Sequence, residues 1–161
     1  MTDDLRVRRL EPDESREPFL PLLLLADEPE PLRQYLNDGD LYVLEDADEP
    51  RGVALLLPVP DEPDAVELKA VAVDASQHNR GLGQWLLAGV LADQRRRGLR
   101  RAIVGTSNAG IGQIAFYQKA GFRLWRIERD YFTPEKGYNP DVREYGLPHR
   151  DMVWFDQEFG G

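Results

Sequence analysis

The amino-acid sequence predicts a mixed α/β (α+β) fold, with a mostly antiparallel sheet of about seven strands and helices on both faces. Apolar, β-branched runs alternate with helical periodicities along the chain, and this order is typical of layered folds. The chain has 161 residues, of which 42 % are hydrophobic and 30 % are charged. This is the composition of a globular protein with one core. We therefore expect a single domain over residues 1–161.

The first half of the chain is predicted to be mostly strands. Alternating apolar and charged residues, or valine-rich runs, predict strands at residues 5–10, 41–47, 51–60 and 65–75. The last of these is apolar on both sides, which is typical of a central strand. Between the first two strands, residues 16–40 predict one or two short helices that are broken at Pro29 and Pro31.

The second half alternates between helices and strands. Leu82, Leu86 and Val90 lie on one stripe of an amphipathic helix that is predicted to end near Arg97, with Gly98 following it. The remaining predictions are a strand at 100–108, a short helix at 109–121 and strands at 122–132 and 150–159. A long loop, 133–149, joins the last two strands.

The charge distribution excludes some partners. The net charge is −9, and the first 50 residues hold 15 acidic and 5 basic side chains. Such a surface disfavours binding to nucleic acid, which depends on cationic side chains. It either keeps the protein in solution or attracts a cationic substrate.

Other classes are excluded by what the sequence lacks. It has no cysteine, which rules out disulfides and thiolate metal sites. It shows no apolar run near the roughly 20 residues of a membrane span and no signal-peptide pattern at the N-terminus. We expect a cytoplasmic protein without a metal, a membrane partner or a nucleic-acid partner.

A glycine-rich turn, "HNRGLG" at residues 78–83, separates the central strand from the long helix. Glycines at a helix N-terminus let an anion approach the unpaired N–H groups of the first turn. A nucleotide-binding Walker A loop needs Lys and Ser or Thr after the second glycine, where Gln84 and Trp85 stand. A Rossmann motif needs a third glycine, where Leu86 stands. Both of these nucleotide motifs are therefore excluded.

Two motifs in the right order resemble the GCN5-related N-acetyltransferase (GNAT) superfamily. The first is "VAVDASQHNRGLGQWLL", which is similar to the family's acyl-CoA loop with Gly81 and Gly83 in place. The second is "SNAGIGQIAFYQKAGF", with Asn108, Tyr117 and a basic-x-Gly-Phe ending. The resemblance covers at least residues 67–123. One departure is His78, where the family usually has Arg or Gln.

The resemblance implies which residues bind the acyl-CoA. The backbone N–H of Val73 would polarise the thioester carbonyl, and Asn108 would bind the pantetheine arm or only cap the following helix. His78 would donate to a phosphate or have no role. The other residues expected to contact the cofactor are Val71, Arg80, Gly81, Leu82, Gly83, Gln84 and Tyr117.

The resemblance also implies the acid and the base of the reaction. Tyr117 would protonate the leaving thiolate, although a tyrosine on an amphipathic helix is otherwise a core residue. Glu67, in an apolar strand, would deprotonate the amine with a pKa raised by burial, unless it pairs with Lys69. His149 and Asp151, beside the last strand, are second candidates for the base.

The expected function is transfer of an acyl group, most simply acetyl from acetyl-CoA, to a primary amine by direct attack. The helical segment 19–38 and the loop 133–148 would select a small-molecule or peptide amine, and aromatic and acidic residues in the loop suit a cationic one. The alternative is a CoA-binding regulatory or interaction module without turnover. The exposed aromatic residues of the tail would serve a homodimer equally well.

Overall fold

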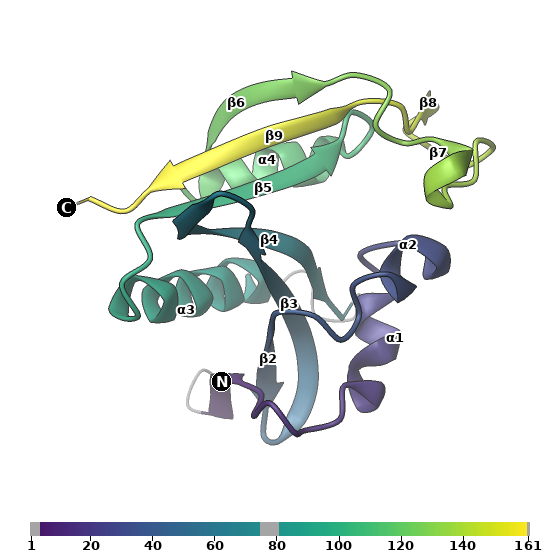
Figure 1. Cartoon of the computed structure of the whole chain (residues 1–161). Helices are drawn as coiled ribbons and strands as arrows, with labels where there is room; N and C mark the ends of the chain where they lie inside the picture. The colour runs from purple at the N-terminus through teal and green to yellow at the C-terminus, as the bar shows by residue number, and fades with distance from the viewer. Residues whose placement is uncertain (1–3, 75–80, 161) are drawn as a thin grey trace.

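The computed structural model describes residues 4–74 and 81–160 and contains one main sheet of seven strands (Figure 1). Its strands are β1 (Leu5–Arg9), β2 (Asp40–Asp46), β3 (Glu49–Val59), β4 (Glu62–Val73), β5 (Arg101–Ser107), β6 (Arg123–Glu128) and β9 (Met152–Glu158). The spatial order is β1-β2-β3-β4-β5-β9-β6, and only β4 and β5 are parallel neighbours. The predicted fold class and the central place of the valine-rich strand are confirmed.

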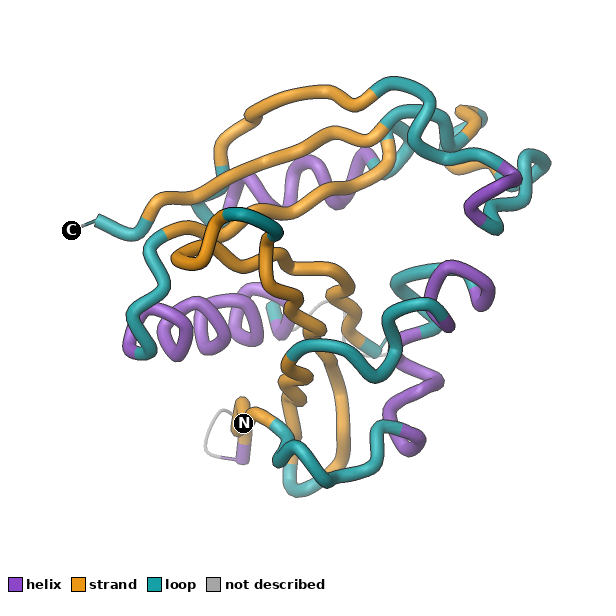
Figure 2. Tube along the Cα trace, in the orientation of Figure 1, coloured by secondary structure: helices purple, strands orange, loops and turns teal. Residues whose placement is uncertain are grey.

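Helices cover both faces of this sheet, as the alternation predicted. Helices α3 (Leu82–Arg96) and α4 (Ile111–Lys119) pack on one face, and α1 (Leu20–Leu23) and α2 (Pro29–Arg33) pack on the other (Figure 2). The apolar stripe of α3 is fully buried at Leu86, Leu87 and Val90. Burying each such side chain stabilises the fold by roughly 1.5–3 kcal/mol.

The prolines of the early helical segment begin a helix instead of breaking one. Pro29 is the first residue of α2 and Pro31 lies in its first turn. The N–H groups of a first helical turn have no partner within the helix, so proline costs little there. The predicted two short helices are present, but the break between them ends before Pro29, and the prediction that Pro31 breaks a helix is wrong.

The late loop has some regular structure of its own. It contains a 3₁₀ turn, η4 (Pro134–Lys136), and a small hairpin of β7 (Arg143–Glu144) and β8 (Leu147–Pro148). A second 3₁₀ turn, η2 (Glu17–Phe19), precedes α1. In the part of the chain that the structure describes, no helix is long and apolar enough to cross a membrane.

A β-bulge in β4 changes which face its side chains reach. Leu55 of β3 pairs with Ala70 and Leu56 pairs with Leu68, so Lys69 is an extra residue in β4. Before the bulge Leu68 faces α3 and α4, whereas after it Ala70 faces α1 and α2. Val71 consequently turns toward α3 and α4, on the opposite face from Glu67. Bulges of this kind redirect side chains at sites.

Candidate active site

A gap between β4 and β5 forms the centre of the candidate site. The two strands pair only from Ala65 to Leu68 and from Arg101 to Val104, and then separate. Two cavities of about 590 Å³ each meet beyond this point. Both are lined by Leu25, Val71, Gln113 and Tyr117.

The helix-side cavity lies between the end of β4, the start of α3 and α4. Gly81 caps α3 in the left-handed conformation, with φ of +70°, and lines the cavity with Gly83 and Gln84. A Cβ on Gly83 would approach the Phe116 ring to 2.9 Å, so α3 and α4 touch here only because residue 83 has no side chain. Among the described residues of this lining, Lys119 is the charged one.

Four other residues were predicted to contact the cofactor at the glycine turn, and the structure describes two of them. The Leu82 side chain is buried in the core, which leaves its main chain for any ligand. The amide of Gln84 donates to the Phe116 carbonyl at 3.2 Å and ties α3 to α4. His78 and Arg80 lie outside the described residues.

The backbone of β4 presents N–H groups to the gap. Asp74 N donates to Arg51 O at 2.7 Å, so Asp74, just after β4, forms a hydrogen-bonded pair with Arg51 of β3. Such pairs alternate along an antiparallel ladder, so the N–H groups of Val71 and Val73 point away from β3 and toward the side where β5 has separated. Val71 lines both cavities, and Val73 lines the helix-side cavity.

Tyr117, from α4, lies where the two cavities meet. Its ring packs edge-on against Phe116 and Phe122 and beside Phe155, with centroids 5.1, 5.9 and 5.9 Å away. Burial raises the pKa of its phenol, which therefore stays protonated at neutral pH. Tyr117 is thus packed in the core and also lines both cavities, so its two interpretations are compatible.

Glu67 lines the loop-side cavity, the second of the two, on the face opposite α3. Burial raises the pKa of its carboxyl group, and the nearby charge of Lys69 opposes this rise. No ion pair joins these two described residues. Lys69 instead lies over the Tyr35 ring, 5.1 Å from its centroid, and 3.5 Å from the Tyr131 hydroxyl. The alternative that Glu67 serves only to pair with Lys69 is not supported.

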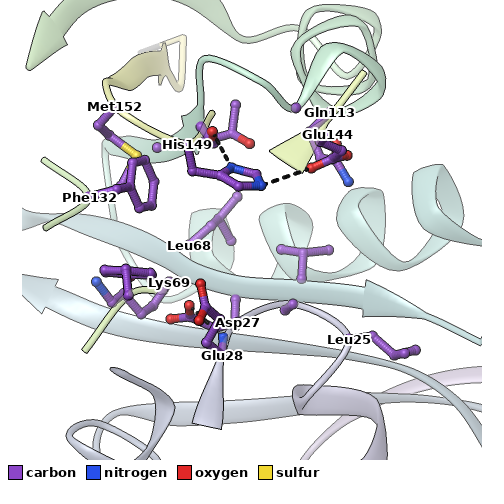
Figure 3. Close-up of a pocket in the computed structure, with 18 of the residues that line it drawn as sticks. Leu25, Asp27, Glu28, Leu68, Lys69, Gln113, Phe132, Glu144, His149 and Met152 are labelled. Carbon is purple, nitrogen blue, oxygen red and sulfur yellow. Dashed lines mark hydrogen bonds and ion pairs between the residues drawn. The ribbon is translucent and has the colours of Figure 1, made fainter. Parts of the chain in front are cut away.

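The wall of the loop-side cavity is built from segments far apart in the sequence (Figure 3). Asp27 and Glu28 come from the connection between α1 and α2. Tyr35 donates to Asp27 at 2.7 Å, and Asn139 N donates to Glu28 at 3.2 Å, so this connection is joined to the late loop. Of the aromatic and acidic residues predicted in the loop, the ones that line the cavity are Phe132, Tyr138 and Glu144.

The charges of the loop-side cavity are strongly unbalanced. Its described lining contains the carboxylates of Asp27, Glu28, Glu67 and Glu144 and a single permanent cation, Lys69. Burial, and then the charge of Asp27, raise the pKa of Tyr138, so its hydroxyl stays neutral. This cavity therefore suits a positively charged ligand better than an anion. In the described part of the chain, no group of three His, Cys, Asp or Glu is arranged to hold a metal.

Three of the residues predicted from the sequence lie near the end of β5, namely Asn108, His149 and Asp151. His149 lines the loop-side cavity, with Nδ1 2.6 Å from Ser107 Oγ. Asp151 does not line it, because its carboxylate accepts the Asp130 N–H at 2.9 Å. Asn108 accepts from Arg150 N and Asp151 N and donates to Pro148 O. Its predicted helix cap is wrong, since Gly110 stands at the N-cap of α4 without a side-chain cap.

Sequence similarity to known proteins identifies the family of the chain. Its sequence matches the acetyltransferase (GNAT) family over residues 5–122, and the chain belongs to this family. It is 34 % identical to the uncharacterized N-acetyltransferase YvbK of Bacillus subtilis (strain 168), over 88 % of this chain and 89 % of that one. The predicted resemblance and the class of enzyme, an acetyltransferase, are confirmed.

Solved structures share the whole fold. A Bacillus subtilis acetyltransferase in complex with CoA is 33 % identical with a TM-score of 0.84, over 97 % of this chain and 99 % of that one. A GNAT family acetyltransferase from Elizabethkingia anophelis with acetyl-CoA bound is 30 % identical with a TM-score of 0.85, over 98 % and 99 %. Both likenesses extend over β1 to β9.

The sequence missed several residues of the loop-side cavity. Asp27 and Glu28 stood out only as part of an acidic first third, and Ser107 only as part of a strand end. Their sequence neighbours give no signal, because the partners that define their roles are about 8 to 110 positions away.

Proposed function

We propose that the whole chain is one N-acetyltransferase domain that transfers acetyl from acetyl-CoA to a primary amine by direct attack. One observation carries this proposal: two cavities enter the β4–β5 gap and share Val71 and Tyr117. A thioester entering through one cavity meets an amine entering through the other. The CoA and acetyl-CoA bound to the two related structures support acetyl-CoA as the co-substrate.

Acetyl-CoA takes the helix-side cavity. The first turn of α3 offers N–H groups and the positive end of its dipole to the pyrophosphate. Gly81, Leu82, Gly83 and Gln84 contribute main-chain groups there, and Lys119 is the charged residue of the described lining. His78 and Arg80 remain proposed phosphate contacts from the sequence, and Asn108 remains a proposed contact of the pantetheine arm.

The thioester carbonyl is polarised by the edge of β4. The N–H group of Val71 is directed to the gap, and donors aimed at an oxyanion lower the barrier of acyl transfer. Val73 remains a proposed contact of the thioester carbonyl from the sequence. Val71 is the better placed of the two at the meeting point, because it lines both cavities. Its contribution comes from the main chain, so side-chain substitution leaves it in place.

Proton transfer uses Glu67 and Tyr117. Glu67 accepts a proton from the ammonium group of the acceptor, and its raised pKa brings it closer to that of a base working near neutral pH. The amine then attacks the thioester carbon, and a tetrahedral intermediate collapses as the carbon–sulfur bond breaks. Tyr117, held protonated by burial, gives its proton to the thiolate.

The acceptor is a cationic amine. Asp27, Glu28 and Glu144 surround the loop-side cavity beyond Glu67, and the rings of Phe132 and Tyr138 line it. Carboxylates attract a second positive group on the acceptor, and aromatic faces bind cations. An amine panel should therefore favour acceptors with more than one positive charge over neutral or anionic ones.

A homodimer through the edge strand β6 is a separate proposal. Leu124 and Ile127 are more than half exposed on this strand, which ends the sheet. Exposed apolar edges are sites of strand pairing. Light scattering on the purified chain should give the mass of two copies, and Leu124→Lys should return it to one.

A cytoplasmic location stays a prediction from the sequence.

A thiol-release assay with acetyl-CoA and an amine panel tests the activity. Tyr117→Phe keeps the packed ring and removes only the hydroxyl, so kcat should fall by about 10²- to 10⁴-fold, the range of general acid–base catalysis. Acetyl-CoA affinity, measured by calorimetry, should stay within about twofold of the original. Tight binding without thiol release for any amine would support the CoA-binding module instead.

A further inference from the structure

We propose that Ser107, His149 and Glu144 form a proton relay that accepts a second proton from the acceptor amine. The proposal rests on the N-acetyl transfer proposed above and adds a catalytic step to it. A primary ammonium group carries three protons, and the amide nitrogen formed from it carries one. Two protons must leave the nitrogen, and Glu67 accounts for the first.

The three side chains lie in one line along the wall of the loop-side cavity. His149 Nδ1 is 2.6 Å from Ser107 Oγ, and its Nε2 is 3.6 Å from Glu144 Oε1 (Figure 3). Ser107 ends β5, Glu144 belongs to β7, and His149 follows β8. All three line the cavity. A hydroxyl, an imidazole and a carboxylate in this order resemble the arrangement that activates serine in hydrolases.

The hydrogen bonds of Ser107 assign the direction of the relay. The Ala109 N–H donates to Oγ at 3.0 Å, which occupies one of its two lone pairs. The carboxylate of Glu144, which can only accept, lies 3.6 Å from His149 Nε2 and favours the imidazole proton on that nitrogen. Nδ1 is then the acceptor of the Ser107 hydroxyl proton. One lone pair of Oγ remains for a ligand in the cavity.

The imidazole is held from several sides. The Phe132 ring meets it edge-on, with centroids 6.0 Å apart. Asn108 fixes the chain on both sides of His149, through Pro148 O and the N–H groups of Arg150 and Asp151. Asn108 is thus a positioning residue for the relay. Preorganisation of this kind is what a proton acceptor needs.

Glu67 and Ser107 lie on the two strands that diverge at the gap. Glu67 projects from β4 and Ser107 ends β5, and both line the loop-side cavity. An amine in this cavity is therefore between two acceptors of different chemistry. Glu67 takes the first proton before attack, and the relay takes the second from the cationic nitrogen of the tetrahedral intermediate.

The protons balance over one turnover. Ser107 Oγ accepts the amine proton while its own proton passes to His149 Nδ1, and Glu144 stabilises the imidazolium. Tyr117 gives one proton to the CoA thiolate as the carbon–sulfur bond breaks. The protein gains two protons and loses one. When Glu67, the relay and Tyr117 return to their starting protonation states, one proton is released to solvent. Ammonium and thioester become amide, thiol and one free proton.

The test measures kcat, KM and acetyl-CoA affinity for Ser107→Ala, His149→Gln and the double variant. Each single change should lower kcat by about 10²-fold, the lower range of general acid–base catalysis, with KM and affinity little changed. Because the two residues act as one unit, the double variant should be no slower than the slower single variant. When Glu67→Gln is added to either single variant, kcat should fall by the product of the two separate factors. Ser15→Ala, which removes a hydroxyl that lines neither cavity, is the control and should keep kcat.

A second readout separates a catalytic role from a structural one. His149→Gly should lose activity and regain it when imidazole is added, while its melting temperature follows that of the original chain. A His149→Gln variant with unchanged kcat, in a chain that acetylates amines, would overturn the relay and leave the proposed function standing. A chain that acetylates no amine at all would overturn both.

Discussion

The two cavities have equal volumes of about 590 Å³ but are built in opposite ways. The helix-side cavity uses a strand end, the glycines at the start of α3, and α4, with Lys119 as the charged residue of its described lining. The loop-side cavity uses charged and aromatic side chains from five separated segments. One presents main chain to its ligand, and the other presents side chains.

This difference separates what is common to the reaction from what is particular to the substrate. A pyrophosphate can be bound by N–H groups that any sequence supplies, provided that no side chain blocks them. An amine has to be recognised by carboxylates, rings and proton acceptors at fixed places. Substitutions in the two cavities should therefore have separable effects on acetyl-CoA and on the acceptor.

The largest expected effect is on the loop-side cavity, at Glu67. Glu67→Gln removes the base and should lower kcat by about 10²- to 10⁴-fold without changing acetyl-CoA affinity. In the original chain, activity should fall as the pH drops through the raised pKa of Glu67, above the ordinary 4.5. Rates measured from pH 5 to 9 check this, and an unchanged acidic limb in the variant would contradict it.

The same substitution should stabilise the fold. The pKa of Glu67 is higher in the folded than in the unfolded chain, so the folded form binds more protons and loses stability as the pH rises above about 4.5. At neutral pH the charged carboxylate is held in a buried place, and Gln removes that charge. Thermal unfolding of both chains should show a higher melting temperature for the variant at pH 7 and a smaller difference at pH 4.

The next effect breaks the helix-side cavity at Gly83. A Cβ there meets the Phe116 ring at 2.9 Å and forces α3 and α4 apart. Overpacking of this kind costs about 1–3 kcal/mol of folding free energy, so Gly83→Ala should lower the melting temperature. The displaced start of α3 should also weaken acetyl-CoA binding. Calorimetry measures the affinity.

Gly112→Ala is the matched control in the same cavity. A Cβ at this position meets no atom within 4 Å, and the backbone is helical. Its melting temperature should stay close to that of the original chain, because the added Cβ displaces no protein atom. Gly81 differs from both, since a Cβ would meet open space but its φ of +70° disfavours any side chain. Equal losses at Gly83 and Gly112 would contradict the steric reason.

The smallest effect is at the outer wall of the loop-side cavity. Asp27→Asn keeps the bond from Tyr35 but removes a charge that faces the acceptor. Partly exposed ion pairs contribute about 0.2–1 kcal/mol, so KM for a polycationic amine should rise by about 1.4- to fivefold. Asp130→Asn is the control, because Asp130 pairs with Arg150 outside the cavity. A matching rise in the control would show that only the overall charge matters.

Prediction from the sequence worked best where a function depends on neighbours in the chain. The glycine turn, the following helix and Tyr117 lie in two short motifs, and the resemblance of these motifs to the family predicted one site for residues that the structure places around one cavity. Glu67 was named through the resemblance to the family, and its apolar strand predicted only that burial would raise its pKa. The alternative that Glu67 pairs with Lys69 was not supported, since Lys69 lies in a bulge that depends on pairing with β3.

The sequence by itself determined the class of fold, the central strand, the helix-side residues and the family, because periodicity and short motifs are local properties. Only the tertiary structure decided that β4 and β5 separate after Leu68 and Val104, and that this gap joins two cavities. It also brought Asp27, Glu144 and His149 to one wall. Those contacts are made by folding segments over 100 residues apart against each other, and no local pattern encodes which distant side chains will meet.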